Sequence, residues 1–196
     1  MAEIKSALEL ALEKTAGVVG DKKKLVEHEA RQTGMRLAGQ FMDNQEKSLE
    51  REIKSLDRDR RSSARSGAFH VLLSHIALPS QEADLGKLAT VEKGLSQLIR
   101  DNAAVENITS QVSQLLQQYL DTKNQVVEQL RQQFEPRMRQ KEEQLAQQTG
   151  RRMRLDPSSD PEFVKVLEQN NEHLQQQYGA VIKQAKEQLT VLFEQG

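Results

Sequence analysis

Apolar residues recur every three or four positions along most of the chain, which is the spacing of one face of an α-helix. The clearest series lies in the middle of the chain and consists of Ile108, Val112, Leu116, Leu120, Val127, Leu130, Phe134 and Met138. Its mean step is slightly longer than the helical period, so it predicts one long and nearly straight helix. Pro136 falls inside this helix and should kink it, because proline removes a backbone hydrogen bond. Alternating β-branched runs do not occur, so the pattern predicts an all-α protein.

Two further helices are expected in the first third of the chain. Residues 2–15 form a short amphipathic series, and the glycines of "AGVVGD" should end it. The next helix is expected to run from residue 22 into the late fifties. Its apolar stripe consists of Leu25, Met35, Ala38, Met42, Leu49, Ile53 and Leu56. Gly34 and Gly39 weaken this helix by about 1 kcal/mol each relative to alanine, and they leave room for a close helix crossing or a bend.

The next part of the chain changes from polar to apolar and then to amphipathic. Residues 57–67 contain no apolar side chain larger than alanine, so they are either a solvated stretch of helix or a connector. Residues 68–78 are apolar around the whole helix, which is typical of a helix buried in a bundle. They reach only about half of the ~20 residues that a membrane span requires. Pro79 should end this segment, and a further stripe after it consists of Leu85, Leu88, Leu95 and Ile99.

Residues 149–161 form the clearest break in the chain, and the loop is expected near residues 149–160. One glycine, paired serines and two Asp-Pro pairs are typical of a loop. Asp160 can cap the last helix, and Pro161 suits its first turn. We therefore expect a small helical N-terminal region over residues 1–79. Residues 80–196 are expected to form an elongated, antiparallel helical hairpin or coiled coil with its loop at this break.

The last helix has the step pattern of a coiled coil. From Val164 onward its apolar positions alternate between steps of three and four, and Asn171 occupies one of them. A buried amide needs a hydrogen-bond partner, and a second amide across the interface supplies one while it fixes the register. The partner helix could be a second copy of the same helix or the central helix of the same chain, and the alternative places Asn171 at the wet edge of an intramolecular hairpin. The predicted partner interface consists of Leu167, Asn171, Leu174, Tyr178 and Val181.

The composition supports long helices with thin apolar stripes. The 196 residues are 36% apolar, 4% aromatic and 29% charged, whereas a compact globule of this length needs more apolar material. The 28 basic and 29 acidic side chains nearly cancel, which argues against a dedicated nucleic-acid binder. The chain contains no cysteine, and this excludes disulfides, thiol nucleophiles and thiolate metal sites.

Residues that could carry out catalysis or hold a metal are scattered. His70 and His75 are five positions apart and therefore lie on different faces of a helix, unlike the two histidines of a helical zinc site. His28 and His173 have no second histidine at metal-binding spacing. Gly-rich phosphate loops and nucleophile elbows also need strands, and none is predicted. We expect no enzyme activity, metal, cofactor or small-molecule substrate.

Two groups of arginines stand in the predicted breaks of the chain. The first consists of Arg58, Arg60, Arg61 and Arg65, and the second of Arg151, Arg152 and Arg154. Both could contact phosphates, but neither is interleaved with aromatic side chains that could stack on bases. Nearby aspartates partly offset their charge, and as solvated connector charge, or charge near a helix C-terminus, they need no function.

The opening "EIKSALELALEKT" resembles the N-terminal stretch of a group of small uncharacterised helical proteins of bacteria, best known from delta-proteobacteria. The resemblance implies a bacterial, cytoplasmic protein and brings no activity, cofactor or ligand. The residues also favour a soluble protein, because no membrane span or targeting segment is found.

Together these features predict a non-catalytic structural or interaction protein that self-associates, or binds another helical protein, through helix–helix contacts. Two alternatives stay open at this point. One is weak nucleic-acid binding through the arginine groups, and the other is a peripheral, stalk- or stator-like part of a larger bacterial assembly.

Overall fold

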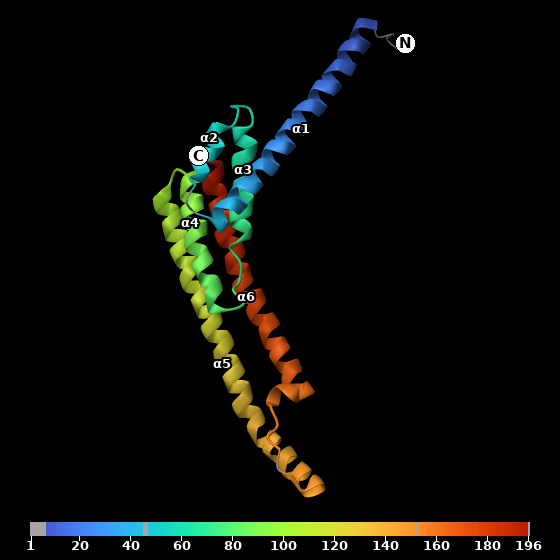
Figure 1. Cartoon of the computed structure of the whole chain (residues 1–196), viewed down its shortest axis with the longest axis vertical. Helices are drawn as coiled ribbons and strands as arrows, with labels where there is room; N and C mark the ends of the chain where they lie inside the picture. Colours follow the sequence, from blue (N-terminus) through green and yellow to red (C-terminus); the bar gives the residue numbers. More distant parts are fainter. Residues whose placement is uncertain (1–6, 45–46, 152, 196) are drawn as a thin grey trace. The chain divides into compact units, whose positions relative to one another are not determined.

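The computed structural model describes residues 7–44, 47–151 and 153–195, with side chains from residue 22 onward (Figure 1). It is 85% helical, and the described residues contain six α-helices and no strand, which confirms the all-α prediction. The helices are α1 (Ala7–Asp43), α2 (Leu49–Ser55), α3 (Arg61–Ser74), α4 (Gly86–Leu98), α5 (Asn102–Thr149) and α6 (Pro161–Glu194), with short 3₁₀ turns η1 (Glu82–Leu85) and η2 (Pro157–Ser159). Among the described residues, no helix combines the length and apolar content that a membrane span requires.

The predicted helix boundaries in the first third of the chain are wrong in two places. α1 continues through the glycines of "AGVVGD", because two glycines cost about 1 kcal/mol each and do not by themselves end a helix. The expected helix from residue 22 to the late fifties is instead divided, since α1 ends at Asp43 and α2 begins at Leu49. Ser48 provides the start signal for α2, and its hydroxyl accepts a hydrogen bond of 3.3 Å from the amide of Arg51.

Of the apolar stripe expected along this part of α1, Ala38 is buried, but the larger residues at its start are not. Leu25 is 58% exposed and Met35 is 38% exposed, whereas the buried face carries mainly small residues. α3 begins at Arg61, within the stretch that was expected to be solvated helix or a connector. Its small residues Ala64 and Gly67 are buried as well. The part of the predicted N-terminal helix before residue 7, with Ile4 of its stripe, lies outside the described residues.

α1 and α3 cross at a very close approach. A methyl group placed on Gly34 would lie 1.8 Å from the carbonyl oxygen of Ala64, and one on Gly67 would lie 2.1 Å from that of Arg31. The close crossing that was one option for Gly34 is therefore present. The small side chains beside it are at most 1% exposed and belong to Ala30, Ala38, Ala64 and Ala68. These helices can approach so closely because their contact face has almost no side-chain bulk.

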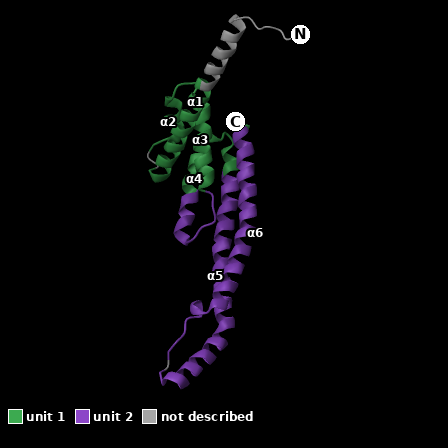
Figure 2. Ribbon diagram, turned by 90° about the vertical axis from the view of Figure 1, so that its right-hand side faces the viewer, with its two compact units in different colours: residues 1–75, 89–105, 195–196 green, residues 76–88, 106–194 purple. Residues whose placement is uncertain are grey.

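The chain divides into two compact units, which Figure 2 shows in different colours. Unit 1 contains residues 1–75, 89–105 and 195–196, and unit 2 contains residues 76–88 and 106–194. The predicted division into 1–79 and 80–196 stays a prediction, and the contacts of residues 89–105 assign them to unit 1. The expectation that residues 68–78 form core holds for α3, where Ala68, Phe69 and Leu72 are buried.

In unit 2, α5 and α6 contact each other through aromatic rings. The rings of Tyr119 and Tyr178 lie 5.3 Å apart, and those of Phe134 and Phe163 lie 5.4 Å apart, both edge to face. Later residues of α5 meet earlier residues of α6, so the two helices run antiparallel here. α5 continues through Pro136, and Gly150 follows its last residue with a left-handed φ of 69°. The elongated shape and the coiled coil stay predictions.

Candidate functional sites

The central part of the predicted interface on α6 packs against α5 of the same chain. Leu174 is buried in a cluster with Tyr119 and Leu120. Tyr178 packs against this cluster, and its hydroxyl lies 3.1 Å from Oγ1 of Thr122. Within unit 2, these two interface residues therefore have partners on α5, and the intermolecular role assigned to them stays a prediction.

The C-terminal part of the predicted interface leaves the buried face of α6. Val181 is 45% exposed, whereas its neighbour Ile182 is only 6% exposed. The buried residues of this helix are Phe163, Leu174, Ile182 and Leu189. Their spacing is closer to the ordinary helical period than to the 3.5 residues of a heptad, so a heptad series drifts across the helix surface. Leu167, at the other end, is half-buried.

Asn171 has an unusual environment on this helix. Its side chain is half-buried, and its Oδ1 atom is fully buried without a hydrogen-bond donor among the residues that the structure describes. The preceding Asn170, in contrast, donates a hydrogen bond of 2.8 Å to the carbonyl oxygen of Val166. A buried acceptor without a donor costs about 1–3 kcal/mol, and such groups are uncommon in native proteins. Asn171 is thus a polar side chain whose hydrogen bonding is incomplete within one chain.

The start of α6 is fixed to α5 by a charged cluster around Asp160. Its Oδ1 caps the helix by accepting a hydrogen bond of 2.9 Å from the amide of Glu162, as the sequence predicted. Its Oδ2 accepts one of 2.6 Å from Nζ of Lys141, and Nε of Arg137 lies 3.7 Å away. The hydrogen bond from Lys141 is the main reason why the pKa of Asp160 lies below its ordinary value. Arg137 also bonds to the carboxylate of Glu162.

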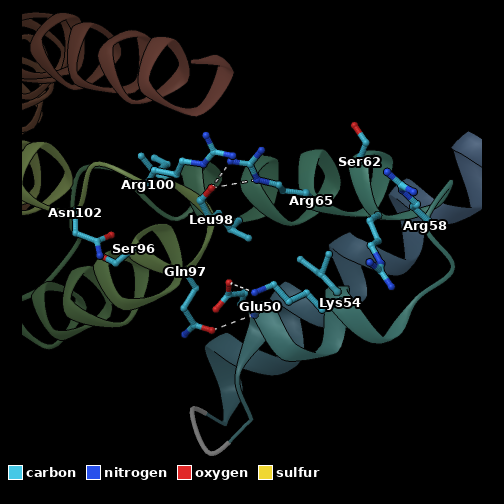
Figure 3. A pocket seen from close by; sticks show the side chains of 13 residues that line it. Glu50, Lys54, Arg58, Ser62, Arg65, Ser96, Gln97, Leu98, Arg100 and Asn102 are labelled. Carbon is cyan, nitrogen blue, oxygen red and sulfur yellow. Dashed lines mark hydrogen bonds and ion pairs between the residues drawn. The ribbon is translucent and has the colours of Figure 1, made fainter. Parts of the chain in front are cut away.

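The first arginine group borders a hollow in unit 1, which Figure 3 shows from close by. Its volume is about 650 Å³, and α2, α3, α4 and the chain around residues 99–102 supply its walls. Five of its lining side chains are cationic: Lys54, Arg58, Arg61, Arg65 and Arg100. Glu50 is the one carboxylate among the lining residues. The sequence grouped three of these arginines, but Lys54 and Arg100 join them only through the fold.

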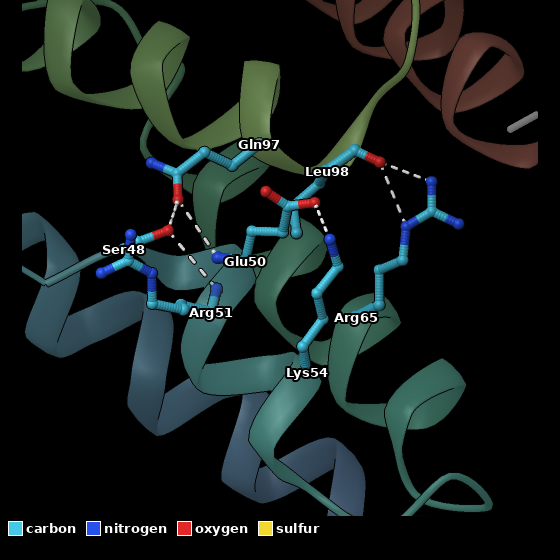
Figure 4. A network of polar contacts seen from close by, with 7 residues as sticks. All are labelled: Ser48, Glu50, Arg51, Lys54, Arg65, Gln97 and Leu98. Atoms are coloured by element: carbon cyan, nitrogen blue, oxygen red, sulfur yellow. Dashed lines mark hydrogen bonds and ion pairs between the residues drawn. The ribbon is translucent and has the colours of Figure 1, made fainter.

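Two contacts with the end of α4 hold the walls of this hollow in place (Figure 4). Oε1 of Gln97 accepts hydrogen bonds from the hydroxyl of Ser48, at 3.0 Å, and from the amide of Glu50, at 3.1 Å. It therefore satisfies one of the free N–H groups in the first turn of α2. On the other side, the guanidinium of Arg65 donates from Nε and Nη2 to the carbonyl oxygen of Leu98, the last residue of α4. A cation at a helix C-terminus is favoured by the helix dipole.

The cationic side chains around the hollow differ in their partners. Glu50 accepts a hydrogen bond of 2.6 Å from Lys54, and both side chains of this pair are exposed. Burial, and next the nearby charge of Arg100, lower the pKa of Arg65. Arg61 donates from Nε to the carbonyl oxygen of Leu56 at 2.8 Å. Arg58 and Arg100 form no ion pair with any residue that the structure describes.

The other residues considered for chemistry do not converge. Arg60 of the first group lies apart from the hollow, 3.9 Å from a carboxylate oxygen of Glu29. In the second group, Arg151 is exposed, Arg154 borders a separate hollow beside Glu142, and Arg152 lies outside the described residues. His28 and His173 each contact a glutamine one helical turn away. No group of three or more potential metal ligands occurs in the described part of the chain.

Comparison with known proteins assigns this all-helical chain to a family. The chain belongs to a family of unknown function (DUF6657), whose model matches residues 50–191. This range contains α3 to α5, all but the first residue of α2, and most of α6. It leaves out the N-terminal residues that carry the predicted delta-proteobacterial resemblance, which stays a prediction. No curated protein and no solved structure matches the chain.

Proposed function

We propose that the protein acts without catalysis, by pairing with a second copy of itself through α6. The observation that supports this proposal is the buried Oδ1 of Asn171, which lacks a donor within the described chain. Asparagine in the seam of a helical interface pairs best with the same asparagine of an identical helix, and the pair fixes register and oligomeric state. The proposal therefore names a second copy, rather than an unrelated helical protein, as the partner.

The environment of Asn171 is compatible with such pairing. The residue is half-buried, so a rotation of the amide about χ2 can turn its oxygen toward a neighbouring helix. Almost three turns further along α6, Val181 is 45% exposed and can extend the contact. Pairing would satisfy the orphaned oxygen and remove its cost of about 1–3 kcal/mol, which would contribute to the stability of the dimer.

Cysteine cross-linking tests this pairing. The natural chain contains no cysteine, so any disulfide must come from the introduced residue. In Asn171→Cys, mild oxidation should join two chains, since a disulfide needs Cα atoms about 4.4–6.8 Å apart. His173→Cys is the matched control, because two residues further along a helix the side chain points about 200° away. Cross-linking of Asn171→Cys alone supports the proposal. Equal cross-linking of both variants, or of neither, contradicts it.

Sedimentation equilibrium of the unmodified chain and of Asn171→Leu provides a second test. The unmodified chain should form one defined oligomer, and Asn171→Leu should change the number of subunits or the dissociation constant, because leucine no longer specifies the register. If the natural chain and Asn171→Leu are both monomeric at all concentrations, self-association through this seam is ruled out.

A further inference from the structure

We infer that the hollow in unit 1 binds a compact anion with two or more phosphoryl groups, and that Arg58 and Arg100 are its recognition residues. This inference does not depend on self-association. It rests on the convergence of five cationic side chains around one hollow, with a single carboxylate that is already bonded to Lys54. The four guanidinium groups match phosphoryl oxygens, because each can donate two parallel hydrogen bonds.

The roles of the four arginines differ. Arg61 and Arg65 also hold the backbone, through the carbonyl oxygens of Leu56 and Leu98. Arg58 and Arg100 have no such partner and are exposed, so they can close on a ligand from the solvent. Figure 3 shows Arg100 beside Arg65 on one side of the hollow and Arg58 on another. An anion beside Arg65 and Arg100 would relieve the repulsion between these two like charges.

The size and lining of the hollow favour a small phosphorylated molecule over a nucleic acid. A volume of about 650 Å³ lies within the range of about 300–1,000 Å³ that is usual for small-molecule sites. The lining contains no aromatic side chain, and single-stranded nucleic acids are bound largely by stacking of bases on such side chains. The apolar lining residues are Ile53, Leu98 and Ile99. The phosphoryl groups are therefore the part of the ligand that this site recognises.

The test is a titration of the purified full-length chain with inorganic pyrophosphate at low ionic strength, followed by calorimetry. One pyrophosphate should bind per chain. Arg58→Gln and Arg100→Gln should each weaken binding about tenfold or more, since each removes hydrogen bonds between charged groups. Arg151→Gln makes the same charge change on an exposed residue outside the hollow, and it should leave the affinity within about twofold.

Thermal unfolding distinguishes a ligand site from a structural cluster. Without ligand, Arg100→Gln should unfold at the same or a higher temperature than the natural chain, because it removes a charge beside Arg65. Pyrophosphate should raise the unfolding temperature of the natural chain, because it binds only the folded form. The rise should be much smaller for Arg100→Gln, because this variant binds pyrophosphate more weakly. If Arg100→Gln unfolds at a lower temperature without ligand, and pyrophosphate shifts neither chain, the arginines serve the fold and the inference is wrong.

A second titration separates the two sources of phosphoryl groups. Single-stranded DNA of mixed sequence should bind more weakly than pyrophosphate, and its weak binding should not depend on Arg58 or Arg100. DNA binding that is tighter than pyrophosphate binding, and that falls in both variants, would assign the hollow to nucleic acid and overturn the inference. Equal losses in Arg58→Gln, Arg100→Gln and Arg151→Gln would overturn it as well, because they would indicate nonspecific attraction to net charge.

Discussion

In unit 1, α1 and α3 approach so closely that a single methyl group has no room at Gly34 or Gly67, whereas in unit 2 aromatic rings lie between α5 and α6. The first contact is made by backbone and alanines, and its strength comes from the short distance and the many small contacts that this distance permits. The second is made by large side chains, each of which buries much apolar surface.

This difference determines which substitutions each unit can tolerate. A close crossing without side chains is sensitive to added volume, because a new atom would have to push two helices apart. A contact through rings is sensitive to lost volume, because the removed atoms leave a cavity that the helices cannot fill. Reciprocal substitutions in the two units should therefore destabilise the protein for opposite reasons.

The largest effect is expected from removal of a ring in unit 2. Phe163 is 2% exposed, and its ring meets that of Phe134 at an interplanar angle of 88°. Phe163→Ala should lower the free energy of unfolding by about 3–5 kcal/mol, as measured by urea denaturation. Phe163→Leu, which keeps much of the volume, should cost clearly less. If the two substitutions cost the same, cavity formation does not dominate the contact between α5 and α6.

A smaller loss is expected from the addition of a methyl group in unit 1. The new Cβ atom of Gly67→Ala would lie 2.1 Å from the carbonyl oxygen of Arg31, so α1 and α3 would have to separate. The cost of such overpacking, about 1–3 kcal/mol, should exceed the gain of up to about 1 kcal/mol from the better helix propensity of alanine. Hydrogen exchange should become faster in α1 and α3 first.

Gly39→Ala is the matched control for this substitution. It makes the same chemical change within α1, but beyond the neighbouring backbone of its own helix no atom lies within 4 Å of the new Cβ. It should therefore stabilise the chain by about 0.5–1 kcal/mol, through helix propensity alone. Stabilisation by Gly67→Ala as well would show that the crossing of α1 and α3 is not as close as described.

The same difference explains which parts of the fold could be predicted from the sequence. The stripe of α5 could be recognised because its large apolar residues, such as Leu116 and Leu130, repeat at helical spacing and are indeed buried. The contact face of α1 could be recognised only in part: Ala38 belonged to the expected stripe and Gly34 indicated a close crossing or a bend, but Ala30 was missed because it has little side-chain bulk. The regular spacing of these small residues, four positions apart, is the signal that could have revealed it.

The candidate sites show a similar limit. Three arginines of the hollow repeat at positions 58, 61 and 65 and could be grouped by sequence, but Arg100 and Lys54 come from other elements. No local pattern reports that the end of α4 packs beside α2 and α3. On α6, the heptad frame placed Val181 at the interface and missed the buried Ile182, because an error of a few degrees per residue accumulates along a helix.

The smallest effect is expected where unit 2 depends on charge rather than on rings. Asp160→Asn keeps a residue that caps helices as well as aspartate does, and it removes the charge that faces Lys141 and Arg137. At pH 7 the variant should be less stable than the natural chain, by less than the loss in Gly67→Ala. Asp160→Ala, which loses the cap as well, should be less stable than Asp160→Asn by about 1 kcal/mol.

The pH dependence of this difference identifies its electrostatic origin. The pKa of Asp160 is lowered in the folded chain, mainly by the hydrogen bond from Lys141, and that of aspartate in an unfolded chain is about 3.9. The charge therefore contributes its full stability above about pH 5, and the contribution is lost as the pH falls through the lowered pKa of the folded state. Urea denaturation of both chains from pH 7 to pH 3 should show a constant difference down to about pH 5 and a shrinking one below about pH 4. A difference that stays constant throughout would mean that shape, and not charge, fixes the start of α6 to α5.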